Sequence, residues 1–213
     1  MTARKVLGQD IIHIAVKARQ QRLNAGRAGN MSVRYDDGFL ITPSAVEYED
    51  LRPNDMVYVD EEGHIDTGGY KPSSEWQLHR DIYAQRADIS AIIHLHSTHA
   101  TTLACLGEDL PAIHYMIAMA GGDNVRCAPY RLFGTQALSD VVCEALTDRY
   151  ACLMANHGLI ACGSTLAQAL EIASEIEQLC QIYLQCLSIG KREILSDDQM
   201  QAVLEKFKDY RPK

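Results

Sequence analysis

Apolar residues recur every three or four positions in several stretches of the chain, the spacing that places them on one face of a helix. This pattern predicts helices over residues 8–23, 75–86, 98–106, 136–147, 165–187 and 196–207. Serines precede several of these stretches: Ser73 and Ser74 before the second, Ser97 before the third. In the last, Ser196 and Gln199 have the spacing of a capping box.

Other stretches are short, apolar or alternating, and bounded by turn residues, which is typical of strands. They cover residues 31–35, 38–42, 56–60, 91–96, 151–156 and 158–163, and residues 64–72 are expected to form a further strand and turn. Strands and helices mix without strict alternation, so the fold class is α/β, of an α+β kind. We expect a central, mostly antiparallel sheet flanked by helices, with residues 1–213 in a single domain.

Composition excludes some classes of function. The chain has 213 residues and a formal net charge of −8, which argues against a nucleic-acid partner or a polybasic membrane surface. No apolar run approaches the roughly 18 residues that span a bilayer, and the charged N-terminal pattern is not a signal peptide. The seven cysteines include no CxxC pair, so we expect free thiols and a cytoplasmic protein.

Three histidines occur in the hexamer HLHSTH at residues 94–99. In a strand, residues i and i+2 point to the same face, so His94 and His96 present two imidazoles side by side. His99 lies on the following helix and points elsewhere. His157, between two apolar strands and before Gly158, which would allow a sharp turn, is the expected third ligand. Three histidines from two segments resemble a catalytic zinc site with an open fourth position.

A simpler interpretation stands beside this one, because a histidine at a strand end is often only a hydrogen-bonded structural residue. On spacing alone, the pair His94 and His96 leaves both interpretations open. For His13, His64 and His79 the structural interpretation is preferred, and His114 is left open.

Glu75 follows two serines at a helix start. It is either a solvated glutamate that complements the helix dipole, or a carboxylate that coordinates the metal at rest and serves as a general acid and base.

Three segments have the composition of an anion-binding loop. GRAGNMS offers backbone amides with Asn30 and Ser32, and ITPSA adds the hydroxyls of Thr42 and Ser44. Ser73 and Ser74 add hydroxyls at a helix N-terminus, where free N–H groups favour an anion. Each segment is weak evidence alone, and their combination with the histidines indicates a phosphorylated substrate.

The segments GNMSVRY, LITPSA, PSSEW, HLHSTH, PAIHYMIAMAGG, CAPY and NHGLIAC occur in the order found in the class II aldolase/adducin family, which the chain resembles over nearly its whole length. The resemblance implies a zinc enzyme that reversibly cleaves a ketose 1-phosphate, such as L-fuculose 1-phosphate, into dihydroxyacetone phosphate and a small aldehyde such as lactaldehyde. Another divalent ion is an alternative to zinc. The resemblance also implies a homotetramer with sites between subunits.

By position, the resemblance implies a role for each matching residue. His94, His96 and His157 are zinc ligands, and Glu75 is the acid/base and resting fourth ligand. Tyr115 acts from the neighbouring subunit, and Phe133 and Tyr210 lie near the aldehyde end. The phosphate contacts are Gly29, Asn30, Ser44, Ser73 and Ser74.

Two positions depart from the family pattern. Arg27 replaces a small or hydroxyl residue, and either contacts phosphate or points to solvent. Ala45 replaces a glycine, which puts the backbone of the phosphate loop in question.

Three alternatives remain. The first is an aldolase for 5-deoxyribulose or 5-methylthioribulose 1-phosphate. These substrates differ from L-fuculose 1-phosphate mainly beyond the bond that is cut. A family epimerase, dehydratase or decarboxylase of a sugar phosphate keeps the site and changes the reaction. The epimerase is less favoured, because no acidic residue occurs in IHYMIAMAGG before Asp123. A non-catalytic scaffold module, as in adducin heads, predicts lost metal ligands, whereas all four candidates are present.

Overall fold

A seven-stranded sheet forms the centre of the molecule in the computed structural model, which describes residues 2–24, 27–66 and 69–210, except for the side chains of residues 209 and 210. The strand order is β3-β2-β1-β4-β7-β6-β5. Only the β5–β6 pair is parallel, so the expected mostly antiparallel sheet is confirmed. The strands are β1 Asn30–Tyr35, β2 Gly38–Ile41, β3 Val57–Asp60, β4 Ala91–Leu95, β5 Cys127–Ala128, β6 Ala151–Met154 and β7 Gly158–Gly163.

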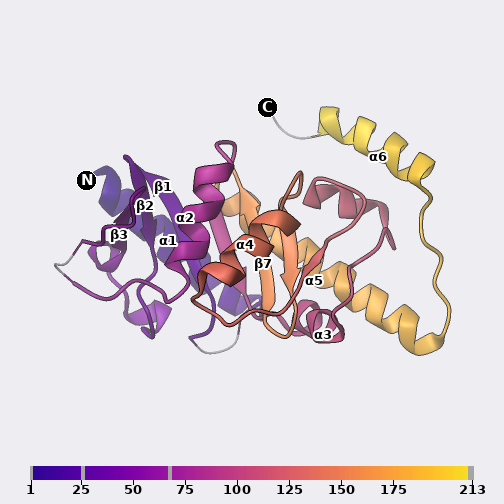
Figure 1. Cartoon of the computed structure of the whole chain (residues 1–213), viewed down its shortest axis with the longest axis horizontal. Helices are drawn as coiled ribbons and strands as arrows, with labels where there is room; N and C mark the ends of the chain where they lie inside the picture. Colours follow the sequence, from indigo (N-terminus) through magenta and orange to yellow (C-terminus); the bar gives the residue numbers. More distant parts are fainter. Residues whose placement is uncertain (1, 25–26, 67–68, 211–213) are drawn as a thin grey trace.

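Helices cover both faces of this sheet (Figure 1). Ile93 of β4 packs in the cluster of α1, α3 and α5, whereas its neighbour Ile92 packs in the cluster of α2 and α4. This alternation along one strand gives the sheet an apolar core on each side. The helices are α1 Ala3–Gln20, α2 Trp76–Gln85, α3 Thr98–Leu106, α4 Gln136–Ala145, α5 Leu166–Ile189 and α6 Asp197–Tyr210, with 3-10 turns η1 Tyr48–Asp50, η2 Pro53–Asp55 and η3 Tyr115–Ala120.

Most predicted elements are confirmed to within a few residues. The capping box forms: Gln199 Oε1 accepts from Ser196 N at 2.8 Å, and Ser196 Oγ accepts from Gln199 N at 3.3 Å. The first helix begins earlier than expected, at Ala3, with Thr2 as its cap. Helix α6 packs beside η3 at the edge of the molecule (Figure 1).

The strand expected within the strand and turn of 64–72 does not form among its described residues. Ile65 makes a single isolated bridge to Val59, and Pro72 makes another to Pro43. Pro72 has no N–H to donate to a ladder, and Gly69 has no side chain to pack, so neither favours a continuous strand. Residues 67 and 68 lie outside the described part of the chain.

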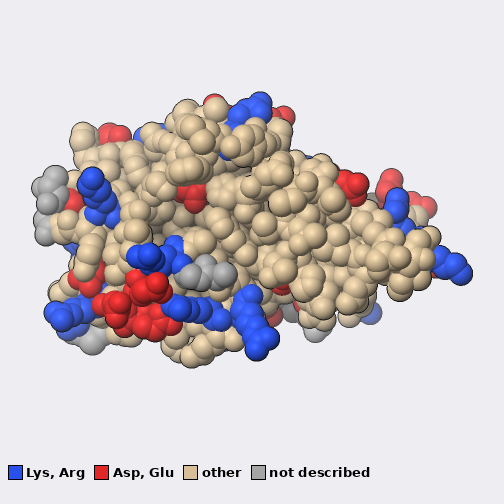
Figure 2. Space-filling view, turned by 90° about the horizontal axis from the view of Figure 1, so that it is seen from below, with Lys and Arg blue, Asp and Glu red and all other residues tan. Residues whose placement is uncertain are grey.

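All seven cysteines are free thiols, as expected, and four of them are buried. No helix among the described residues is long and apolar enough to cross a membrane. On the face drawn in Figure 2, acidic and basic side chains cluster together at one end, and most of the remaining surface is uncharged. Ion pairs such as those of Arg19 with Glu47 and Glu49 join charges of opposite sign.

Candidate active site

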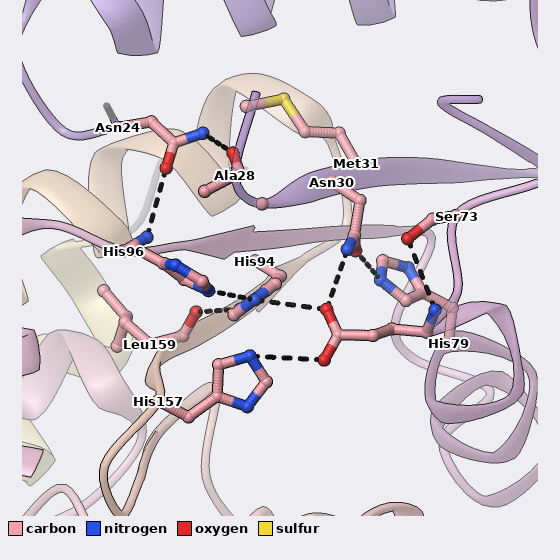
Figure 3. Close-up of polar contacts among 12 residues, drawn as sticks. Asn24, Ala28, Asn30, Met31, Ser73, His79, His94, His96, His157 and Leu159 are labelled. Atoms are coloured by element: carbon pink, nitrogen blue, oxygen red, sulfur yellow. Dashed lines mark hydrogen bonds and ion pairs between the residues drawn. The ribbon is translucent and has the colours of Figure 1, made fainter. Parts of the chain in front are cut away.

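Three imidazoles meet where β4 ends and β6 turns into β7 (Figure 3). His94 is in β4, His96 follows it, and His157 lies in the turn. Their ring centroids are 4.8 to 5.0 Å apart, and one nitrogen of each lies within 4.8 Å of the others. The structure therefore brings together the three histidines that the sequence selected. His99 does point elsewhere: its Nδ1 is 2.8 Å from Glu177 Oε1 on α5.

The turn at His157 is built differently from the prediction. Asn156, not Gly158, takes the left-handed conformation, with φ of 55°. Gly158 is needed for space instead, because a Cβ there would lie 2.5 Å from the Leu95 carbonyl oxygen and 2.9 Å from His96 Cδ2. Asparagine tolerates the left-handed region better than most residues, so glycine remains free for the close approach.

The hydrogen bonds of His94 determine which nitrogen it offers. Its Nδ1 lies 3.0 Å from the Leu159 carbonyl oxygen, so Nδ1 carries the proton and Nε2 carries the lone pair. That Nε2 is 2.9 Å from His96 Nε2. Two ring nitrogens this close need a proton or a cation between them. The donor set therefore fits a metal ion.

Glu75 lies directly against these imidazoles. Its Oε2 is 3.2 Å from His94 Nε2, and its Oε1 is 3.3 Å from His157 Nε2. Oε1 is buried without a hydrogen-bond donor. Such an acceptor is costly unless a positive charge faces it, which is a second sign that the residues fit a cation.

The interpretation of Glu75 as a solvated first-turn glutamate is wrong. The residue is the N-cap of α2, not part of its first turn, and it is 6% exposed. Asn30 Nδ2 donates to its Oε2 at 2.9 Å. This hydrogen bond from β1 therefore holds the carboxylate in the interior, away from solvent.

Protonation in the cluster suits metal binding. Burial lowers the pKa of His96 to about 4 and also lowers that of His157. Burial opposes ionisation of Glu75, but the adjacent imidazoles of His94 and His157 and the hydrogen bond from Asn30 together lower its pKa. Neutral imidazoles and an ionised carboxylate are the forms that bind divalent metals.

A cavity of about 360 Å³ opens beside this cluster. It is lined by most of the residues that the sequence assigned to substrate binding. These are Arg27, Gly29, Asn30, Ser44, Ala45, Ser73, Ser74, Glu75 and Phe133, together with His96 and His157. The sequence did not single out Tyr48, Tyr130, Arg131 and Asn156, which also line it. The loops that carry serines, Gly29 and Arg27 thus face the same space as the imidazoles.

Two hydroxyls expected in the anion-binding loops are elsewhere. Ser32 is 0% exposed and bonds His79 and Tyr83, and Thr42 is 1% exposed and accepts from Met31 N at 3.2 Å. Ser32 lies in β1, between β2 and β4 in the sheet, and His79 and Tyr83 of α2 contact its hydroxyl. The polarity of a residue does not by itself reveal such burial. The prediction that Ser32 and Thr42 offer their hydroxyls to a bound anion is wrong.

Three aromatic predictions differ in outcome. Phe133 lies at the cavity and is 62% exposed. Tyr115, at the start of η3, is 49% exposed and does not line this cavity, so its role stays a prediction. Tyr210 ends α6, and its side chain lies outside the described residues.

The two departures from the family pattern contact each other. Ala45 has φ of 61°, a left-handed conformation that costs about 1–2 kcal/mol for a residue with a Cβ. Arg27 Nη1 donates to the Ala45 carbonyl oxygen at 3.2 Å, and its Nε lies 3.5 Å from Glu47 Oε1. Arg27 therefore binds the loop backbone instead of pointing freely to solvent.

We expect Arg27→Met to raise KM for a phosphorylated substrate about two- to fivefold with kcat unchanged, because exposed charge pairs contribute only about 0.2–1 kcal/mol. The side chain is 58% exposed, which supports the lower end of that range. Steady-state kinetics measure the change. Lys17→Met removes the same charge from the exposed side of α1 and should leave KM unchanged. A larger loss of kcat than of affinity would contradict this role.

Two residues lie beneath the site: Asn24, which the sequence did not single out, and His79, which was expected only as a hydrogen-bonded structural residue. Asn24 Oδ1 accepts from His96 N at 3.2 Å and its Nδ2 bonds the Ala28 carbonyl, so it holds a ligand segment and the glycine loop together. His79 is fully buried, and its Nε2 is 2.6 Å from Asn30 Oδ1. The spacing of Glu75 and His79, four residues apart at the start of one helix, was the available signal.

Glu177 of α5, not Ser97, caps helix α3. The Ser97 side chain makes no capping bond. The Glu177 carboxylate instead accepts from His99 N at 2.9 Å and Ala100 N at 2.8 Å. This contact anchors the segment that follows His96 to the long helix across the core.

We expect Glu177→Ala to lower the free energy of unfolding by about 1–2 kcal/mol, because it leaves two helix N–H groups without an acceptor. Burial opposes ionisation of Glu177, but the backbone bonds dominate and lower its pKa. A depressed folded pKa means that this stabilisation is present above the ordinary glutamate pKa and lost as pH falls below it. Urea unfolding at two pH values tests this, with Glu171→Ala on an exposed position of α5 as control.

Comparison with known proteins gives a consistent result. The family described as Class II Aldolase and Adducin N-terminal domain matches residues 9–184. A Rhodospirillum rubrum protein named 5-methylthioribulose-1-phosphate/5-deoxyribulose-1-phosphate aldolase is 50% identical, over 98% of this chain and 94% of that protein. The Escherichia coli K12 L-fuculose phosphate aldolase is 46% identical, over 97% and 96%.

Solved structures resemble the whole chain. An L-fuculose 1-phosphate aldolase has a TM-score of 0.92 at 39% identity, with 98% of each chain covered. The L-fuculose-1-phosphate aldolase of Thermus thermophilus has a TM-score of 0.77 at 30% identity, over 91% of this chain and 100% of that one.

Proposed function

The chain belongs to the class II aldolase and adducin family and is a class II aldolase, and on that premise we propose that it is a zinc enzyme that reversibly cleaves a ketose 1-phosphate. The products are dihydroxyacetone phosphate and a small aldehyde. One observation carries the proposal: Glu75 and three imidazoles converge beside a cavity lined by Ser44, Ser73 and Ser74. This arrangement supports a site in which acid–base chemistry and phosphate binding share one space.

We assign zinc to His94, His96 and His157, with Glu75 as the fourth ligand at rest. Four nitrogen and oxygen donors suit zinc, although another divalent ion could use them. When bound, the ion supplies Lewis-acid stabilisation of the negative charge that develops on substrate oxygens during cleavage.

The protein's own groups do the remaining work. Ser44, Ser73 and Ser74 hold the phosphate, with free N–H groups at the start of α2 adding to its attraction. Gly29, with φ of 82°, brings the backbone close: a Cβ there would lie 2.5 Å from the His94 carbonyl oxygen. Holding the phosphate fixes the distance from substrate carbons to Glu75.

Glu75 returns a proton to the substrate carbon when the carbon–carbon bond breaks, and removes it in the reverse direction. Tyr115 of a neighbouring subunit serves the oxygen of the aldehyde half. Its exposure and its absence from the lining of this chain's own cavity fit a homotetramer with sites between subunits. Phe133 and Tyr210 are assigned to the aldehyde end, and Arg27 and Ala45 shape the phosphate end.

The substrates named for the relatives share one chemical feature. L-fuculose, 5-deoxyribulose and 5-methylthioribulose 1-phosphates all end in a methyl or methylthio group. Exposed Tyr130 and Phe133, 56% and 62% accessible, offer apolar contact at the cavity. We propose that the aldehyde carries such an apolar end, with lactaldehyde, acetaldehyde and methylthioacetaldehyde as candidates. The 50% identity to the methylthioribulose enzyme keeps that substrate beside the fuculose type.

A condensation assay tests the function. Dihydroxyacetone phosphate is incubated with these three aldehydes and with glycolaldehyde, which differs from acetaldehyde by one hydroxyl. We expect ketose 1-phosphate formation that is lost with a chelator, restored by zinc and slower with glycolaldehyde. Absence of carbon–carbon bond formation with every aldehyde would refute the aldolase substrate class.

Two coarser features complete the proposal. We propose that residues 1–213 form one domain, since elements from both halves of the chain pair in one sheet. We also propose a cytoplasmic location, which the seven free thiols fit.

A further inference from the structure

A buried line of five polar side chains ends on Glu75. Tyr83 OH lies 2.8 Å from Ser32 Oγ, which lies 2.6 Å from His79 Nδ1. His79 Nε2 is 2.6 Å from Asn30 Oδ1, and Asn30 Nδ2 is 2.9 Å from Glu75 Oε2. Figure 3 labels two members of this line, Asn30 and His79. All five residues are at most 6% exposed.

The direction of every bond in this line follows from its last member. An ionised carboxylate is an acceptor only, so the Asn30 amide must turn its NH₂ group toward Glu75. Asn30 Oδ1 then faces His79, and it can only accept. His79 must therefore carry its proton on Nε2 and donate to Asn30.

The bonds on the far side of His79 have fixed directions too. Complete burial favours the neutral imidazole, so His79 Nδ1 has a lone pair and accepts from the Ser32 hydroxyl. Having donated to His79, Ser32 Oγ accepts from the Tyr83 hydroxyl. All four donors thus point toward Glu75, and no other arrangement satisfies every group.

The members of this line are held by rigid elements. Asn30 begins β1 and pairs directly with His94 of β4 in the sheet register. His79 lies in α2, the helix that Glu75 caps, and its N–H donates to the Glu75 carbonyl oxygen at 3.5 Å. A rotation of the Asn30 amide would place its oxygen against the Glu75 carboxylate, which is repulsive. His79 is the group that prevents this rotation.

We propose that His79 is a positioning residue: by donating from Nε2 it fixes the Asn30 amide, which in turn holds the Glu75 carboxylate at the orientation needed for proton transfer. This role rests on the proposed function, in which Glu75 moves the proton. His79 itself does not line the cavity, and it acts only through Asn30.

The tautomer can be measured without any activity. Nitrogen-15 NMR of the zinc-loaded protein distinguishes protonated from unprotonated ring nitrogens, and His79→Gln identifies the signals of His79 by their loss. We expect the proton on Nε2 and a lone pair on Nδ1. A proton on Nδ1 would overturn the proposal.

Two substitutions separate hydrogen bonding from packing. Glutamine at position 79 can accept from Ser32 and donate to Asn30, whereas leucine can do neither. We expect His79→Leu to lower kcat for hydrogen exchange between dihydroxyacetone phosphate and deuterium oxide about 10- to 100-fold, with KM unchanged. His79→Gln should recover most of that rate. His13→Leu, on an exposed position of α1, should match the wild type.

Each outcome is decisive when zinc content and folding are measured on the same samples. A wild-type rate in His79→Leu would overturn the proposal. So would a His79→Gln variant that is folded, zinc-loaded and as slow as leucine. If His79→Leu does not fold, the rate of His79→Gln and the tautomer measured by NMR still test the proposal. A failure of the proposed function is distinguishable, because it would appear as absent exchange in the wild type.

Discussion

Glu75→Gln lowers hydrogen exchange into dihydroxyacetone phosphate about 10²- to 10⁴-fold, the usual contribution of a positioned general acid or base. Glutamine keeps the size of the side chain and can still accept from Asn30, which in the wild type donates to Oε2 at 2.9 Å. It cannot take up the substrate proton. The expected result is therefore a loss of rate in a protein that remains folded.

The same variant should bind zinc with reduced affinity, because an amide oxygen is a weaker ligand than a carboxylate. Proton NMR in deuterium oxide measures exchange, and atomic absorption measures the metal. Glu61→Gln makes the same change at an exposed turn and serves as control. If Glu75→Gln kept full exchange, the acid/base assignment would be wrong.

His157→Ala should reduce the metal content from about one ion per chain to near zero and remove activity with it. Lewis-acid stabilisation is worth several kcal/mol of barrier, which corresponds to a loss of about 10³-fold or more. The substitution also removes the group 3.3 Å from Glu75 Oε1, a buried acceptor without a hydrogen bond.

His99→Ala is the matched control for this experiment, because His99 belongs to the same hexamer as His94 and His96 but contacts Glu177. It should retain the metal and its activity. Chelation of the wild type should reproduce the effect of His157→Ala, and added zinc should reverse chelation only. An active, metal-free His157→Ala protein would contradict the proposed metal site.

Much of the fold follows from local patterns. Alternation along a strand is a property of the backbone, so the shared face of His94 and His96 could be predicted from residues i and i+2 alone. The capping box of Ser196 and Gln199 is similarly local and forms as expected. Periodicity also located the helices to within a few residues.

The errors occurred where distant contacts decide. Ser32 has the polarity expected of a residue in an anion-binding loop. However, β1 is an interior strand of the sheet, and α2 supplies the hydrogen-bond partners of the Ser32 hydroxyl. Ser97 has the sequence of a cap, but Glu177 from a distant helix takes that role. Glu75 was not an error of this kind, since only the alternative of a solvated residue is excluded: Asn30 and the imidazoles enclose it.

The sequence by itself predicted the class of the protein, most of its elements and the candidate residues of the site, because side-chain identity and short-range periodicity are written along the chain. The roles of Tyr115 and Tyr210 stay predictions. Only the tertiary structure decided how Glu75 is held, since its partners come from β1, β4 and the β6–β7 turn. The direction of a hydrogen bond depends on what lies on its far side, so the orientation of Asn30 and the tautomer of His79 require the folded molecule.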